Sequence, residues 1–242
     1  MIKTIPLSLC LLSGILFTGN PVNADIPLTQ ASTASPTVPQ RISQASTSAN
    51  VKLLLEDLPE GFQELPPELA ASLASQFRLL TQQFQQANLN PENLFAFVNP
   101  ESFQIVLGFT SPLSSEQDWV NFDTTVQQLQ QPEIQQLLVS QLKQRLQGMG
   151  EINVLEYKPL PELNNLADTS TGFTLGIDME GTPLQLDMAT FRRGGMVAFT
   201  GVMYLNGQMP LIQVGDVAQT LDSRIVKVSA QSYPASLAKH RF

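Results

Sequence analysis

Cysteine and histidine are almost missing from this chain of 242 residues, which contains one of each. The cysteine is Cys10, close to the N-terminus, and the histidine is His240, in a polar stretch at the other end. A Ser-His-Asp or Cys-His catalytic site needs a firmly held imidazole beside a nucleophile, and zinc sites of the common kinds need Cys and His. The sequence therefore predicts no enzyme of these classes, no zinc site and no internal disulfide.

Basic residues are also scarce. The chain has 13 Lys and Arg against 21 Asp and Glu, which gives a net charge of −8. An acidic surface is repelled by phosphate backbones, so we expect no nucleic-acid partner. A glycine-rich phosphate loop followed by Lys is missing, and no GxGxxG follows an expected strand, so the sequence also predicts no nucleotide cofactor.

Long apolar runs are missing as well, because the longest, Ile5 to Phe17, is far shorter than the ~20 residues of a membrane-spanning helix. Lys3 precedes this run, and the small-residue pattern Val22-Asn23-Ala24 follows it. These features are typical of a signal peptide over residues 1–24, cleaved between Ala24 and Asp25. An uncleaved anchor is the alternative. We expect membrane contact only through the signal peptide during export.

The rest of the chain divides into a linker, one domain and a tail. Residues 25–50 are rich in Ser, Thr, Ala, Pro and Gln without apolar periodicity, which predicts a disordered linker. Periodic apolar patterns extend over 51–231, which we interpret as a single domain. Residues 232–242 are polar and predict a loose tail.

Four helices are expected in the domain. The first begins at Pro66, and a second follows a capping box formed by Ser114 and Gln117. A third restarts at Pro132, and a last one is capped by Asp216. Each has an apolar face at helical spacing, that of the first helix being Leu69, Leu73, Phe77, Leu80, Phe84 and Ala87.

Residues 171–205 predict three consecutive strands joined by Gly-containing turns. Apolar residues alternate in the first, which indicates one buried and one solvated face. In the second, Phe191 breaks the alternation, which predicts a bulge near Ala189–Thr190 or a sheet edge packed on both sides. The third is apolar at nearly every position and should be central. With strands at 94–98, 103–110 and 152–157, the fold class is α+β: an antiparallel sheet of about six strands flanked by amphipathic helices.

Two groups of charged residues are candidate sites. Asp178, Glu180 and Asp187 are expected to share one face of a hairpin, close enough for a calcium site or an acid/base pair. The alternative is a solvated face, in which Asp178 and Asp187 are dispensable. Arg192 and Arg193 lie at a turn and are candidates for contacting an anion, the alternative being simple exposure.

Three stretches resemble secreted proteins: LLLEDLPEGF at 53–62, FRRGGMVAF at 191–199 and DSRI at 222–225. They are similar to uncharacterised secreted proteins of cyanobacteria, and more distantly to actinobacterial extracellular sensor-like and lipoprotein domains. The resemblance implies an exported, non-enzymatic antiparallel sheet with flanking helices and transfers no catalytic residue. It leaves open whether the compartment is the periplasm, the outside or the thylakoid lumen.

These observations favour an exported, non-catalytic binding or interaction domain whose partner is an unknown protein or an apolar ligand. One alternative is a carrier that holds a lipid-like ligand between the sheet and the helix after Pro66. A third hypothesis is an enzyme that uses carboxylates alone.

Overall fold

A computed structural model describes residues 51–66, 91–147, 152–179 and 181–231 of the chain. The predicted signal peptide, its Ala24–Asp25 cleavage site, the linker, nearly all of the helix after Pro66, and the tail lie outside these residues. Among the described helices, none is both long and apolar enough to cross a membrane.

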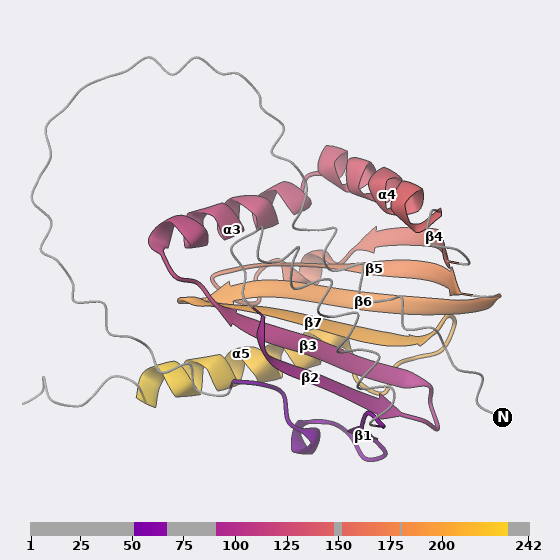
Figure 1. The fold of residues 1–242 in the computed structure, drawn as a ribbon, viewed down its shortest axis with the longest axis horizontal. Coiled ribbons are helices and arrows are strands. Elements are labelled where there is room, and N and C mark those ends of the chain that lie inside the picture. The colour runs from indigo at the N-terminus through magenta and orange to yellow at the C-terminus, as the bar shows by residue number, and fades with distance from the viewer. Residues whose placement is uncertain (1–50, 67–90, 148–151, 180, 232–242) are drawn as a thin grey trace, which may run out of the picture.

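Seven antiparallel strands form one sheet in the order β1-β2-β3-β7-β6-β5-β4 (Figure 1). The strands are β1 Gln63–Glu64, β2 Glu92–Asn99, β3 Gln104–Pro112, β4 Ile152–Pro159, β5 Thr169–Met179, β6 Thr182–Arg193 and β7 Met196–Leu205. The α+β class is confirmed, and β7 is central as its apolar sequence predicts. The strand missed by sequence reasoning is β1, which has two exposed residues and therefore no periodicity to detect.

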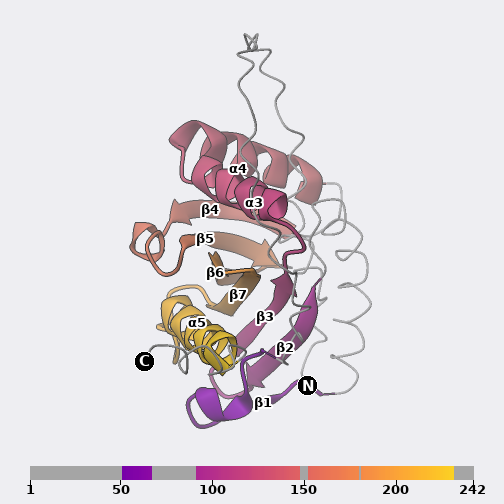
Figure 2. The same cartoon turned by 90° about the vertical axis from the view of Figure 1, so that its left-hand side faces the viewer.

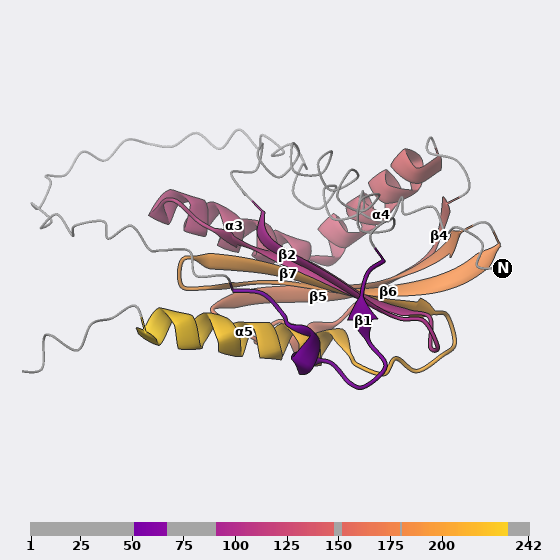
Figure 3. The same ribbon diagram turned by 60° about the horizontal axis from the view of Figure 1, so that its bottom comes forward.

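Helices lie on opposite sides of the sheet (Figure 3). Helices α3 (Glu116–Leu129) and α4 (Pro132–Gln147) lie on one side, where α3 packs against β5 and β6 and α4 packs against β4. Helix α5 (Val214–Gln231) packs against β6 and β7 on the other. Figure 2 shows α3 and α4 at the β4 end of the sheet and α5 beside β7. We call the two sides of the sheet the α3–α4 side and the α5 side.

Each side has its own apolar core. The core on the α3–α4 side includes Phe109 and Phe199, whose rings stack with centroids 5.6 Å apart, together with Leu175, Leu186, Val126 and Leu142. The core on the α5 side joins Phe191 and Val202 to Val217, Leu221, Leu53 and Phe95. The sheet is thus buried from both sides over its centre.

Burial on both sides explains why Phe191 breaks the apolar alternation of β6. It replaces the two predicted explanations, a bulge and a sheet edge. The ladders of β6 with β5 and with β7 run without a register shift, so no bulge lies at Ala189–Thr190. Strand β6 is also internal, not at an edge. Leu184, Leu186 and Met188 face the α3–α4 side, and Phe191 faces α5. A shift does occur in the edge strand β4, between Val154 and Glu156.

Strand β5 is buried on both faces too, so the expected solvated face is wrong. Thr174, placed on that face by the alternation, is 4% exposed. On the same face, Gly172 lies beneath Leu163, a residue of the short 3-10 helix η3 (Pro161–Leu163). A polar residue in an alternating strand does not distinguish water from a second layer of protein.

The predicted helix starts are shifted by one or two residues. Ser115, not Ser114, caps α3: its hydroxyl accepts a hydrogen bond from the Asp118 amide at 3.1 Å. Helix α5 begins at Val214, which places Asp216 in the first turn instead of at the cap. Acidic residues are favoured both at the N-cap and in the first turn, because the helix dipole is positive at this end.

Candidate functional site

Arg192, a candidate for anion contact, lies on the α3–α4 side at the end of β6. Its Nε and Nη2 atoms donate to the two carboxylate oxygens of Asp123 in α3, at 2.8 and 2.7 Å. Its guanidinium carbon lies 5.7 Å from the ring centroid of Trp119, also in α3. Arg192 therefore fastens α3 to the sheet.

Arg193 performs the same task on the α5 side, because neighbouring residues of a strand project to opposite faces. Its Nε and Nη2 donate to the two carboxylate oxygens of Asp222 in α5, each at 2.7 Å. Nη2 also donates to the backbone carbonyl of Leu166 at 3.3 Å.

Asp168 joins the two arginines around the end of the sheet. Its Oδ2 accepts from Arg192 at 3.2 Å and from the backbone amide of Gly194 at 2.8 Å, and its Oδ1 accepts from Arg193 at 3.0 Å. We call Arg192, Arg193, Asp123, Asp168 and Asp222 the arginine clamp. The hydrogen bond to Asp123 raises the pKa of Arg192, and that to Asp222 raises the pKa of Arg193.

The clamp occupies the N–H groups that an anion would need. An incoming anion would have to compete with three carboxylates for two guanidinium groups. The anion contact at Arg192 and Arg193 stays a sequence prediction, and we take the clamp to have a structural role.

The carboxylates Asp178 and Asp187 share the α5 side of the sheet, but they do not lie close together. Asp178 pairs across the hairpin with Pro183, and Asp187 pairs with Thr174, which lies four residues before Asp178 in β5. At ~3.4 Å per residue this separation is about 14 Å, too long for a shared ion or an acid/base pair. Glu180 lies outside the described residues. Within the described part of the chain, no group of three or more His, Cys, Asp or Glu could hold a metal ion.

Asp178 has a local role. Its Oδ1 accepts a hydrogen bond from the backbone amide of Gly181 at 2.9 Å, in the turn between β5 and β6. The left-handed conformation of Gly181 (φ 78°) suits such a turn.

Asp187 is the centre of a hydrogen-bonded cluster that spans three strands. Thr174 of β5 donates to its Oδ1 at 2.6 Å, and the hydroxyl of Tyr204 in β7 donates to its Oδ2 at 2.8 Å. The side-chain amide of Gln185 in β6 approaches Oδ1 at 3.5 Å. We call these four residues the Asp187 cluster. Asp187 is therefore not a simple solvated carboxylate, and the expectation that it is dispensable stays a prediction.

Two of the three donors of this cluster are buried. Thr174 is 4% exposed and Tyr204 is 5% exposed, whereas Asp187 itself is only partly buried. Burial, together with the hydrogen bond to Asp187 and the charge of that carboxylate, raises the pKa of Tyr204 above its ordinary value. Tyr204 thus stays protonated and acts as a hydrogen-bond donor.

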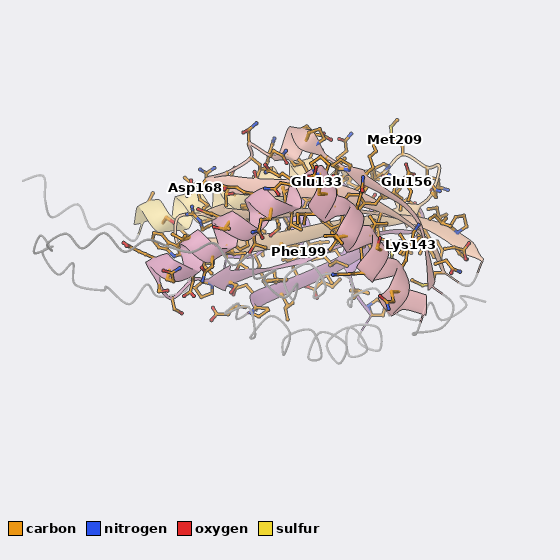
Figure 4. The ribbon with its side chains drawn as sticks, turned by 90° about the horizontal axis from the view of Figure 1, so that it is seen from above. Glu133, Lys143, Glu156, Asp168, Phe199 and Met209 are labelled. Carbon is orange, nitrogen blue, oxygen red and sulfur yellow. The ribbon has the colours of Figure 1, made fainter. Side chains whose placement is uncertain are left out.

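Exposed side chains of β4 lie beside the cluster on the α5 side. The register shift in β4 places both Leu155 and Glu156 against Gly176 of β5, and Lys158 pairs with Thr174. Leu155 is 53% exposed, and Glu156 and Lys158 are also exposed. We define the β4 patch as these three residues together with the Asp187 cluster. Figure 4 shows Glu156 and Met209 toward one end of the molecule and Asp168, in the clamp, toward the other.

Sequence reasoning missed Thr174, Gln185 and Tyr204 as members of a site. Tyr204 is a polar-tipped residue in an otherwise apolar central strand, and a buried tyrosine hydroxyl normally finds a partner. That signal pointed to some acceptor, but the sequence could not identify it as Asp187, because the pairing of β6 with β7 sets the register.

The proposed carrier cavity remains untested. On the sheet side, Phe199 and Met203 are buried in the core of the α3–α4 side. The helix expected to form its other wall lies outside the described residues.

The three stretches that resemble secreted proteins meet in space. Arg224 donates to Asp57 at 2.6 Å and lies 3.4 Å from Glu56, which fastens α5 to the segment around 53–62. Arg193 and Asp222 join the other two stretches. No protein-family model matches the chain, and a search of curated proteins finds no significant match. The resemblance therefore stays a prediction.

Proposed function

We propose that this protein is an exported, non-catalytic binding domain and that it binds its partner through the β4 patch. The observation that supports this proposal most directly is the Asp187 cluster. A carboxylate is held by buried donors from two neighbouring strands, yet it remains open enough to reach a second molecule.

The surroundings favour binding over chemistry. Leu155 is a large apolar side chain with half its surface exposed, beside exposed charges of both signs. Interfaces commonly combine an apolar contact with charged groups that set orientation. A tyrosine with a raised pKa is a poor proton donor in a reaction, whereas it is well suited to orient a carboxylate.

Export is supported by the sequence alone, through the pattern of residues 1–24. A secreted or periplasmic protein without a disulfide depends on its apolar core for stability, and this chain has two such cores. The carboxylate-only enzyme is less favoured, because Asp178 and Asp187 lie about 14 Å apart along the hairpin.

The test is recovery of a bound molecule from the exported protein by native mass spectrometry and affinity capture. Leu155→Asp and Asp187→Asn should abolish retention of whatever the wild type retains. Val120→Asp is the matched control, because Val120 in α3 is as exposed as Leu155 but on the other side of the sheet. Equal retention by all three variants would refute the site, and a wild type that retains nothing would refute the function.

A further inference from the structure

The connection between β7 and α5 contains the chain's one Asn-Gly pair, Asn206-Gly207. Both residues are exposed, and Met209, further along the same connection, is 89% exposed (Figure 4). An asparagine that precedes glycine is prone to attack by the next backbone nitrogen, because glycine has no side chain to hinder the approach. The structure decides whether the folded protein permits this attack.

The local hydrogen bonds leave both reacting groups accessible. The backbone amide of Gln208 donates to the carbonyl of Leu205 at 3.1 Å, which makes Asn206 and Gly207 the central residues of a β-turn. The backbone amide of Asn206 donates to the carbonyl of Pro183 at 3.0 Å. In the described part of the chain, by contrast, neither the backbone amide of Gly207 nor the side chain of Asn206 has a hydrogen-bond partner.

The surroundings of Gly207 are open as well. Its φ of 84° lies in the left-handed region, and a Cβ added to it would meet no atom within 4 Å. The peptide group between Asn206 and Gly207 can therefore turn toward the asparagine side chain without displacing a neighbouring residue.

Two other asparagines in turns and loops lack this arrangement. Asn165 is also exposed, but the next residue is Leu166, whose side chain hinders attack and whose backbone amide donates to Oγ of Ser170 at 2.9 Å. Asn99 is 3% exposed and precedes Pro100, which has no N–H. Exposure and an accessible attacking nitrogen thus coincide at Asn206 and at neither of these positions.

We propose that Asn206 is a site of spontaneous covalent modification, at which water converts the asparagine into isoaspartate and aspartate. The backbone nitrogen of Gly207 loses its proton and bonds to Cγ of Asn206. The bond between Cγ and Nδ2 breaks, and Nδ2 takes up a proton and leaves as ammonia. Water then opens the cyclic imide: cleavage between the nitrogen and the backbone carbonyl carbon gives isoaspartate, and cleavage between the nitrogen and Cγ gives aspartate.

The modification changes the charge and the length of this connection. Both products add a negative charge at neutral pH, and isoaspartate also adds a methylene group to the main chain. Beyond the site, the side chain of Gln104 accepts from the amide of Leu211 at 2.8 Å and donates to the carbonyl of Ile212 at 2.9 Å. The added length is taken up before this anchor, so we expect the modified protein to stay folded.

The test is peptide mapping of the purified full chain after storage in neutral buffer prepared with heavy-oxygen water. Tryptic cleavage after Arg193 and Arg224 releases a peptide in which Asn206 is the only asparagine. We expect this peptide to exchange the side-chain amide nitrogen for a heavy oxygen with time, and fragmentation to locate isoaspartate at Asn206. Because the attacking nitrogen must lose its proton, the reaction should be faster in alkaline buffer.

The same measurement on the native and the urea-unfolded chain isolates the contribution of the turn. Asn206 should react in both states, whereas Asn165 should stay unmodified in the native state. Asn206→Gln should abolish the reaction, because glutamine cannot form the five-membered imide. Gly207→Ala should slow it, because a Cβ hinders the attacking nitrogen.

An Asn206 that stays unmodified in the native chain would overturn the proposal, even if the unfolded chain reacts. Equal modification of Asn165 in the native chain would overturn it too, as would aspartate formed without isoaspartate or an unchanged rate in Gly207→Ala. These results leave the proposed function untouched, because it concerns the β4 patch.

Discussion

Arg192 and Arg193 are neighbours in the chain, yet they fasten helices on opposite sides of the sheet. Arg192 forms two hydrogen bonds with the carboxylate of Asp123 in α3, and Arg193 forms two with that of Asp222 in α5. The alternation of a strand makes this possible, because two consecutive residues reach both layers. The end of β6 is thus where the two helical layers are tied to one strand and, through Asp168, to each other.

Replacing either clamp arginine with lysine should destabilise the fold by about 1–3 kcal/mol, between the values for exposed and buried ion pairs. Lysine keeps the charge but cannot form the two parallel hydrogen bonds of a guanidinium. Arg224→Lys is the control, since Arg224 reaches Asp57 through a single nitrogen, and it should cost less. Urea denaturation measures all three.

The fluorescence of the chain's single tryptophan distinguishes the roles of the two arginines. Trp119 lies beneath Arg192, so Arg192→Lys should change its fluorescence emission in the native state. Arg193 faces the other side of the sheet, and Arg193→Lys should leave the native emission unaltered. Equal changes in both variants would argue against independent anchoring of the two layers.

Thr174→Val should lower the free energy of unfolding by about 1.5–3 kcal/mol, because it removes a hydrogen bond to a charged group while keeping the side-chain shape. Thr200→Val is the matched control. The hydroxyl of Thr200 is buried without a hydrogen-bond partner, so this change should be neutral or stabilising. The comparison of the two melting temperatures tests the Asp187 cluster, and equal losses would contradict its assignment.

Stability should fall between pH 10 and about pH 12. Burial raises the pKa of Tyr157 from 10.0 to about 12, so the unfolded chain loses this proton first. The contribution of Tyr157 to the free energy of unfolding is therefore fully present below pH 10 and is lost as the pH rises to about 12. Tyr157→Phe keeps the ring that stacks on Phe173 and should make the decline shallower in pH-dependent denaturation. An identical decline in this variant would refute the assignment.

The exported protein should begin at Asp25, because the sequence places the cleavage site after Ala24. N-terminal sequencing of material recovered outside the cytoplasm checks this prediction. A protein that still begins at Met1 would support the uncleaved anchor.

The sequence by itself determined the class of fold and most of its elements. Strong apolar periodicity and the Gly-containing turns identified β5, β6, β7 and α5 to within a few residues, because these signals are local. The near absence of His and Cys likewise predicts no catalytic or zinc site built from those residues. Local signals did not decide between equivalent neighbours: Ser114 and Ser115 are adjacent, and either could cap the helix that follows.

Only the tertiary structure decided what the polar and charged residues do. In the sequence, Phe191 interrupts the apolar alternation of β6, and Thr174 lies on the expected solvated face of β5. Both patterns were misread, because alternation cannot show whether a second layer of protein covers a strand. Apart from Gln185, which is two positions from Asp187, the side-chain partners of Arg192, Arg193 and Asp187 lie 13 to 69 positions away. Strand register and helix docking set those pairings, and both result from packing the whole chain, which no local pattern encodes.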